Sequence, residues 1–123
     1  MKVFTTDKIR NVVVLGHSGA GKTSLVSAMT NIASGTKSRV TEPPATTQMV
    51  VWPILWEDYK INILDVPGSY DFVGEIEEAV GVADAAIIVI SGKNGVENGT
   101  RKAWALCEKY HLPRIVYVSD MDM

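Results

Sequence analysis

Cysteine, long apolar runs and an excess of either charge are all scarce in this sequence of 123 residues. Cys107 is the one cysteine, which excludes an intrachain disulfide and a metal site built from several cysteines. The longest apolar run, Ala85 to Ile90, is far shorter than the about 20 residues of a membrane-spanning helix. The N-terminus, MKVFTTDKIRN, is polar where a signal peptide has an apolar stretch. These absences predict a cytoplasmic protein.

Charges of the two signs nearly cancel. Twelve Lys and Arg stand against fourteen Asp and Glu, which gives a formal net charge of −2. Such a chain has no broad basic field for DNA, RNA or a membrane surface, so any phosphate must be bound by a local site. The apolar fraction of 46% is that of a globular protein with a packed core. The length predicts one domain, residues 1–123.

Strand and helix patterns alternate along the chain. β-branched runs without polar alternation are typical of strands buried in a parallel sheet, and apolar residues spaced by three and four predict helices. The predicted strands are Asn11–Leu15, Met49–Trp56, Lys60–Leu64, Ala85–Ile90 and Arg114–Val118, and the predicted helices are Lys22–Ala33, Phe72–Val80 and Asn98–His111. This alternation predicts an α/β fold.

Single residues refine this outline. Pro53 places the second predicted strand at an edge of the sheet, because proline cannot donate to a neighbouring strand. Glu57 and Asp58 predict a hairpin turn to the third strand. We expect the tryptophans to pack, and Cys107 to fill the core as a small apolar side chain. The inward face of the last helix is predicted to be Ala103, Trp104, Leu106, Cys107 and Tyr110.

A glycine-rich segment follows the first predicted strand and precedes the first predicted helix. It fits the pattern G-x-x-x-x-G-K-[ST], in which backbone N–H groups surround phosphate oxygens and the helix N-terminus adds its positive dipole. We expect Lys22 to reach the β- and γ-phosphates and the Thr23 hydroxyl to ligate Mg²⁺. His17 is expected to be an unconstrained position of this loop. The candidate phosphate-binding residues are Gly16, His17, Ser18, Gly19, Ala20, Gly21, Lys22, Thr23 and Ser24.

The segment Asp65-Val66-Pro67-Gly68 ends the third predicted strand. Open α/β sheets place their ligand crevice at such strand ends. Asp65 is a candidate for holding the water shell of Mg²⁺, and Gly68 is a candidate for turning its N–H toward the terminal phosphate. A strand-ending turn without a ligand is the alternative.

Several segments, taken in order, resemble the GTP-binding domain of translation elongation factor G and its relatives. They are IRNVVVLGHSGAGKTSLVSAM, KINILDVPGSYDFVGE, VADAAIIVI, GVENGTRKAW and LPRIVYVSDMD, which cover nearly the whole chain outside residues 35–48. The resemblance implies a Ras-like P-loop NTPase fold with three α/β/α layers and a mostly parallel sheet. It also implies the strand order second, third, first, fourth, fifth, with the second strand antiparallel. Domains of this family continue to a sixth strand and a final helix, so a C-terminally truncated domain is expected.

The resemblance also implies metal and catalytic residues. Thr23 and Asp65 would position Mg²⁺, and a threonine of the first switch loop, which falls at Thr46, would complete the metal shell; a solvent-exposed hydroxyl is the alternative for Thr46. After D-x-P-G the family carries a histidine that orients the attacking water, whereas this chain has Ser69. Lys22 and Ser69 are therefore the candidate catalytic residues, and GTP hydrolysis is expected to be slow or absent.

The guanine-reading motif Asn-Lys-x-Asp of the family appears here as Ser119-Asp120-Met121-Asp122. Asp122 can accept hydrogen bonds from guanine, and Ser119 can keep one hydrogen bond. Asp120 lacks the lysine stem that would cover the base. At about 1 to 3 kcal/mol for an unmade buried hydrogen bond, affinity would fall roughly 10- to 100-fold. A polar strand end is the alternative.

Three functions remain open at this point: a slow GTPase, a nucleotide-gated interaction module that does not hydrolyse GTP, and a P-loop protein without guanine selectivity. The expected ligands are GTP or GDP with Mg²⁺, and the resemblance adds the ribosome or another protein as partner, without DNA or membrane binding. Val116 and Val118 are expected on an exposed edge strand, which predicts self-association.

Overall fold

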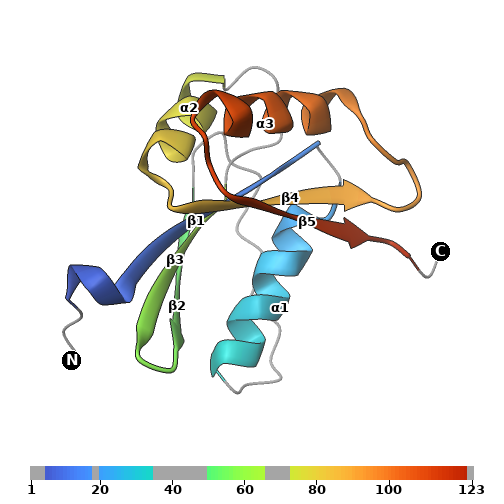
Figure 1. Cartoon of the computed structure of the whole chain (residues 1–123). Coiled ribbons are helices and arrows are strands. Elements are labelled where there is room, and N and C mark those ends of the chain that lie inside the picture. The colour runs from blue at the N-terminus through green and yellow to red at the C-terminus, as the bar shows by residue number, and fades with distance from the viewer. Residues whose placement is uncertain (1–4, 18–19, 35–49, 66–72, 122–123) are drawn as a thin grey trace.

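The sheet follows the expected order in a computed structural model that describes residues 5–17, 20–34, 50–65 and 73–121 (Figure 1). Its order is β2-β3-β1-β4-β5. β1 pairs in parallel with β3 and β4, β4 pairs in parallel with β5, and β2 pairs antiparallel with β3. The strands are β1 (Ile9–Gly16), β2 (Val50–Trp56), β3 (Tyr59–Asp65), β4 (Ala85–Ser91) and β5 (Arg114–Ser119). The α/β class and the mostly parallel sheet are confirmed.

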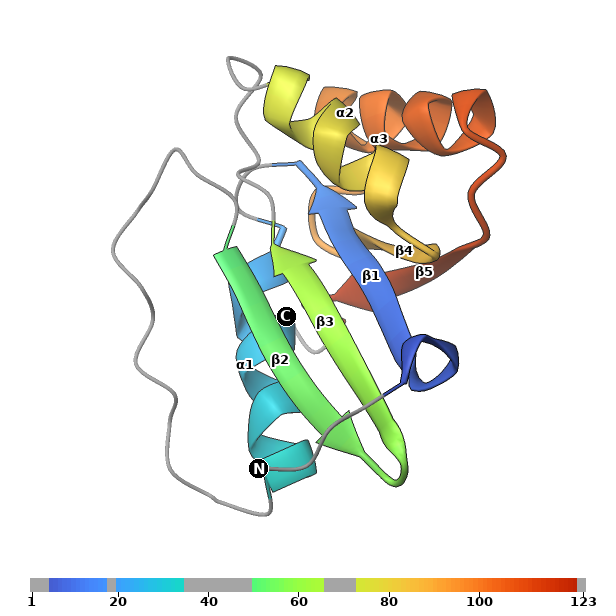
Figure 2. The same ribbon diagram turned by 90° about the vertical axis from the view of Figure 1, so that its left-hand side faces the viewer.

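Helices cover both faces of the sheet. α1 (Lys22–Ser34) lies on one face, and α2 (Val73–Val82) and α3 (Asn98–Lys109) lie together on the other (Figures 1 and 2). A short 3₁₀ helix, η1 (Thr6–Lys8), precedes β1. No helix within the described ranges is both long and apolar enough to cross a membrane. Each predicted element is present, with bounds that differ from prediction by at most two residues.

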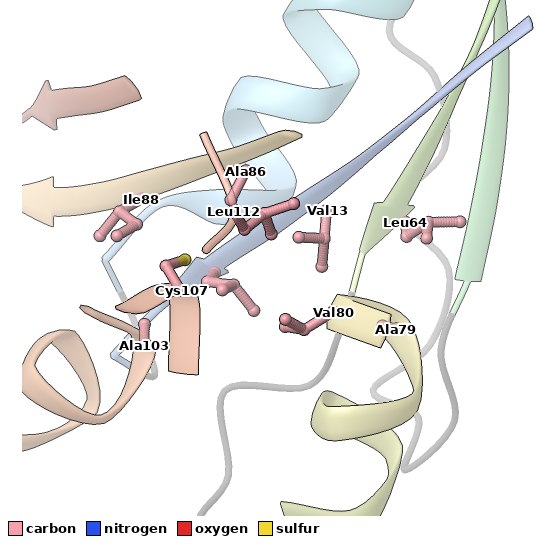
Figure 3. Close-up of a cluster of buried hydrophobic side chains, with 10 residues drawn as sticks. Val13, Leu64, Ala79, Val80, Ala86, Ile88, Ala103, Cys107 and Leu112 are labelled. Carbon is pink, nitrogen blue, oxygen red and sulfur yellow. The ribbon is translucent and has the colours of Figure 1, made fainter. Parts of the chain in front are cut away.

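Two apolar clusters hold these layers together, because successive residues of a strand point to opposite faces. The cluster beneath α2 and α3 includes Val13, Leu15, Leu64, Ala79, Val80, Ala86, Ile88, Ala103, Cys107 and Leu112 (Figure 3). The cluster beneath α1 includes Val14, Ala20, Val26, Ile54, Ile63 and Val89. Cys107 is fully buried, so its predicted place in the core is confirmed.

The predicted inward face of α3 is wrong for its two aromatic residues. Trp104 is 47% exposed and Tyr110 is 41% exposed, whereas Ala103 and Cys107 are buried. Trp104 follows Ala103 directly and is therefore turned about 100° around the helix axis. The Arg114 guanidinium lies 4.5 Å from the centre of the Trp104 ring, so this ring packs against a half-buried cation rather than in the core.

β2 and β5 form the two edges of the sheet and expose different residues. Pro53 lies in β2 at one edge, and the turn to β3 passes through Glu57 at a φ of 54°, as the predicted edge strand and hairpin require. Trp56, at the end of β2, is 51% exposed, so its predicted packing is wrong. Trp52 packs against the α1 cluster. β5 forms the other edge, where the exposed apolar residues are Ile115, Val116, Tyr117 and Val118.

Candidate functional site

The carboxyl ends of the parallel strands meet at one edge of the sheet. β1 ends at Gly16, β3 at Asp65, β4 at Ser91 and β5 at Ser119. Open α/β sheets bind ligands in the crevice beyond these ends. The candidate phosphate loop begins where β1 ends, at Gly16, and α1 begins at Lys22.

Two glycines of the loop occupy positions where a side chain would be strained. Gly16 has a φ of +156°, and a Cβ added there would lie 2.6 Å from the Val89 carbonyl oxygen of the neighbouring strand. Gly21 has a φ of +100° and lies immediately before α1. L-residues rarely adopt such φ values. The glycine spacing of the motif therefore corresponds to a backbone requirement in this fold.

Lys22 is a buried cation at the first position of α1. Its side chain is only 8% exposed, and its Nζ donates a hydrogen bond to the Gly16 carbonyl at 3.2 Å. Burial lowers the pKa of Lys22, and the nearby Asp65 carboxylate partly opposes that shift. Because a buried ammonium is costly without an anion beside it, this amine favours a negatively charged ligand at the loop.

Asp65 places carboxylate oxygens at the same edge. It is half-buried at the end of β3 and stands in register with Val14 of β1. Carboxylate and hydroxyl oxygens are the donors that Mg²⁺ prefers, so the chemistry of Asp65 fits this ion. Thr23 lies in the first turn of α1, but its side chain is outside what the structure describes. Thr46 also lies outside the described residues.

Ser119 ties the end of β5 to the phosphate loop. Its hydroxyl donates a hydrogen bond of 2.6 Å to the carbonyl oxygen of Ala20, and lies 3.4 Å from the carbonyl oxygen of Ile90. Ala20 is 2% exposed and donates its own N–H to the His17 carbonyl at 3.1 Å. Two parts of the predicted site, 99 positions apart in the sequence, are therefore joined directly.

Asp120 contacts Ser91, the last residue of β4. Its carboxylate accepts a hydrogen bond of 3.1 Å from Ser91 Oγ, and Asn94 N–H donates to the same Ser91 oxygen at 3.3 Å. Asp120 adopts a φ of 55°, a conformation that aspartate tolerates better than most residues. Sequence reasoning missed this contact, because it joins polar residues from two strand ends that no motif connects.

His17 is held by two groups near the start of α3, so its predicted status as an unconstrained position is wrong. Its Nδ1 accepts a hydrogen bond of 3.1 Å from the backbone N–H of Gly99. Its Nε2 lies 3.3 Å from a carboxylate oxygen of Glu97. No local pattern in the sequence signals this contact, since its partners are separated by 82 positions.

The remaining candidate residues are either exposed or outside the described residues. Ser24 is exposed in the first turn of α1. The candidates that lie outside the described residues, besides Thr46, are Ser18, Gly19, Gly68, Ser69 and Asp122. The structure thus brings together Gly16, His17, Ala20, Gly21, Lys22, Asp65 and Ser119 at one edge of the sheet.

Comparison with known proteins agrees with this arrangement. The chain is 34% identical over 131 aligned residues to an elongation factor G from Thermotoga neapolitana, an alignment that covers 94% of this chain and 19% of that protein. A mitochondrial ribosome-releasing factor 2 from Anopheles gambiae is 32% identical, with 94% of this chain and 18% of that protein covered. The chain therefore spans about one-fifth of the length of these relatives.

A solved structure and a family match extend the comparison. Translation elongation factor SelB from Methanococcus maripaludis, in complex with the GTP analogue GppNHp, superimposes with a TM-score of 0.80 at 25% identity, covering 99% of this chain and 24% of that one. Residues 7–123 match the family described as the Elongation factor Tu GTP binding domain. Because that match takes in both the phosphate loop and the whole described sheet, the chain belongs to the GTP-binding domain family of elongation factor Tu.

Proposed function

We propose that this domain binds GTP and GDP together with Mg²⁺, as a translation-factor domain of the elongation factor G type. The observation that carries the proposal is the buried Lys22 amine, whose charge interacts with the Asp65 carboxylate at the carboxyl edge of the sheet. A cation for phosphate and a candidate oxygen donor for a metal thus lie at the same edge. The GTP analogue in the SelB structure supports the same ligand class.

Each described residue has a defined part in this proposal. Lys22 would pair with the β- and γ-phosphates, and the backbone N–H groups of the loop would donate to phosphate oxygens at the N-terminus of α1. Asp65, with the candidates Thr23 and Thr46, would hold Mg²⁺. When bound, the ion would neutralise charge on the phosphates.

We further propose that hydrolysis is slow or absent. Lys22 would stabilise the charge that develops on the phosphate oxygens during hydrolysis. Ser69, however, has no imidazole to orient the attacking water as the family histidine does. Loss of a positioned polar or charged group typically lowers a rate by about 10² to 10⁴. A nucleotide-gated interaction module that does not hydrolyse GTP is therefore the main alternative.

A second candidate, a P-loop domain without guanine selectivity, is favoured by a separate observation. The Ser119 hydroxyl donates to the Ala20 carbonyl, and the Asp120 carboxylate accepts from Ser91. Both side chains are thus engaged within the protein rather than held ready for a base. Guanine recognition would then depend mainly on Asp122.

The proposed partner follows from the relatives' names. Elongation factor G and ribosome-releasing factor 2 are the most similar relatives described above, so we propose the ribosome, or another protein, as partner of this domain. We also propose that the chain acts in the cytoplasm.

Calorimetric titration with GTP, GDP and ATP, each with Mg²⁺, tests the ligand. We expect GTP and GDP to bind more tightly than ATP, and the addition of EDTA to weaken GTP binding. Equal affinity for ATP would replace the guanine-specific proposal with the second candidate. No binding of any of the three nucleotides would overturn the proposed function.

Measurement of phosphate release tests hydrolysis. The wild-type domain is compared with Lys22→Ala, which removes the amine that stabilises the developing charge. Release that is slow but faster than in Lys22→Ala supports a weak GTPase. Release no faster than in that variant identifies the interaction module, provided that the wild-type domain binds GTP in the titration.

A further inference from the structure

The His17 imidazole lies between the phosphate loop and the first turn of α3. Its Nδ1 is 3.1 Å from the Gly99 backbone nitrogen, and its Nε2 is 3.3 Å from Glu97 Oε2. Both side chains of the His17–Glu97 pair are largely buried, at 23% and 27% exposure. Both ring nitrogens therefore have a defined partner on the same short segment.

The hydrogen bonds assign the tautomer of this ring. Nδ1 faces an N–H group and must act as the acceptor, so the proton of the neutral ring belongs on Nε2, where it is donated to the Glu97 carboxylate. Each nitrogen thus has a partner of matching polarity. Such a ring is fixed in both position and orientation.

The segment that holds the ring has hydrogen bonds of its own, one to a side chain and one within the backbone. Glu97 N–H donates to Thr100 Oγ1 at 3.3 Å, and Arg101 N–H donates to the Glu97 carbonyl at 3.1 Å. Thr100 is 6% exposed, which fixes this turn against the core. His17 is therefore attached to a rigid helix start and not to a surface loop.

Close approach at Gly99 strengthens the attachment. A Cβ added to Gly99 would lie 2.7 Å from the His17 Cα and 2.8 Å from Nδ1. The backbone of the phosphate loop and that of α3 are therefore in direct contact here, which only a residue without a side chain permits.

We infer that His17 is a positioning residue of the nucleotide site, which fixes the phosphate loop by joining its start to the first turn of α3. The inference rests on the proposed nucleotide binding. His17 lies directly after Gly16, and its carbonyl accepts the Ala20 N–H. Its ring thus anchors one side of the loop, while Ser119 anchors Ala20 on the other. A loop held from both sides loses less conformational freedom when phosphate binds.

Three substitutions at this position separate the two contacts. His17→Asn places an amide oxygen near the position of Nδ1, so it can still accept from Gly99. His17→Gln places an amide nitrogen near the position of Nε2, so it can still donate to Glu97. His17→Ala removes both contacts. His111→Asn is the matched control: it removes the exposed imidazole beyond the far end of α3 and keeps a residue that tolerates the φ of 52° there.

The experiment measures the dissociation constant and the release rate of Mg²⁺·GDP for all five proteins, together with their unfolding by urea without nucleotide. We expect His17→Ala to bind GDP about tenfold more weakly, through faster release. His17→Asn should recover most of that loss and His17→Gln little of it, because the Gly99 amide is the partner nearest to the loop backbone. His111→Asn should match the wild type.

The possible outcomes are distinct. Wild-type affinity in His17→Ala would overturn the inference alone, whereas no GDP binding by the wild type would overturn the proposed function and the inference with it. If His17→Ala does not fold, the comparison of His17→Asn with His17→Gln decides. Equal GDP affinity in those two variants, or losses that only follow their loss of stability, would also overturn the positioning role.

Discussion

Lys22 is a single residue whose burial is expected to cost stability in the unliganded fold. Its amine is buried, and burial lowers its pKa below the ordinary value of 10.5. Between the lowered pKa and 10.5 the unfolded chain binds more protons at this group than the folded chain does. Stability of the unliganded domain should therefore rise with pH through that range. A bound phosphate would supply the missing negative charge.

The variant Lys22→Met tests this reading. Without nucleotide at pH 7, we expect the variant to have a higher unfolding free energy than the wild type, because the cost of burying the Lys22 ammonium exceeds its attraction to Asp65. The difference should shrink as the pH rises toward 10.5, because the wild-type amine then begins to lose its proton in the unfolded chain as well. GTP affinity should fall about 10- to 100-fold, as expected for loss of a charged hydrogen bond worth about 1.5 to 3 kcal/mol.

Urea denaturation from pH 7 to pH 10 measures the stability difference, and calorimetry measures the affinity. Lys93→Met is the control, since Lys93 is an exposed lysine between β4 and α3. A stability difference that does not change with pH would contradict the assignment of the cost to the buried charge of Lys22.

At the scale of elements, a glycine in the first turn of α3 and one in the last turn of α2 have very different surroundings. Gly81 lies in α2, and a Cβ added there would meet nothing within 4 Å. Gly99 lies in α3, where the added Cβ would approach the backbone of His17 to 2.7 Å. Helix propensity favours alanine over glycine at both positions, so a destabilisation at Gly99 alone would report its tertiary contact.

We expect Gly81→Ala to stabilise the domain by about 0.5 to 1 kcal/mol, since alanine removes the backbone entropy cost of glycine within a helix. Gly99→Ala should destabilise it despite the same local gain, because α3 must move away from the phosphate loop. Thermal and urea unfolding of the two variants measure both effects. Stabilisation by Gly99→Ala would show that α3 can shift away from His17 at little cost in free energy.

At the scale of the whole molecule, the two edges of the sheet differ in their capacity to pair with another chain. β2 contains Pro53, which has no N–H to donate to an added strand. β5 has no proline, and its four central residues are apolar with exposures of 43% to 68%. Exposed apolar edge strands pair readily with other chains, so we propose that a second copy of this chain pairs along β5.

Light scattering over a series of protein concentrations tests this pairing. We expect the apparent mass of the wild-type chain to rise with concentration, and Val116→Lys or Val118→Lys to reduce the rise by placing charge at the edge. Val51→Lys, on the opposite edge strand, should leave it unchanged. A monodisperse monomer at the highest concentration would contradict the proposal.

Much of the fold and of the phosphate loop could be predicted from the sequence, because both depend on short-range patterns. β-branched runs indicate buried strands wherever they lie, and the spacing of Gly16, Gly21 and Lys22 is a local backbone requirement. Pro53 likewise predicted an edge strand, because proline has no N–H to donate to a neighbouring strand. The resemblance to elongation factor G then predicted the order of the strands in the sheet.

The tertiary structure alone decided which of these residues are buried and what they contact. Lys22 is enclosed only because α1 packs onto the sheet, and Trp104 is exposed because its neighbours Ala103 and Cys107 take the inward face. The bond from His17 to Gly99 joins residues 82 positions apart, and that from Ser119 to Ala20 joins residues 99 positions apart. The sequence by itself determined the local chemistry of the site, whereas its rigidity comes from contacts that exist only once distant strand ends and helix starts have met.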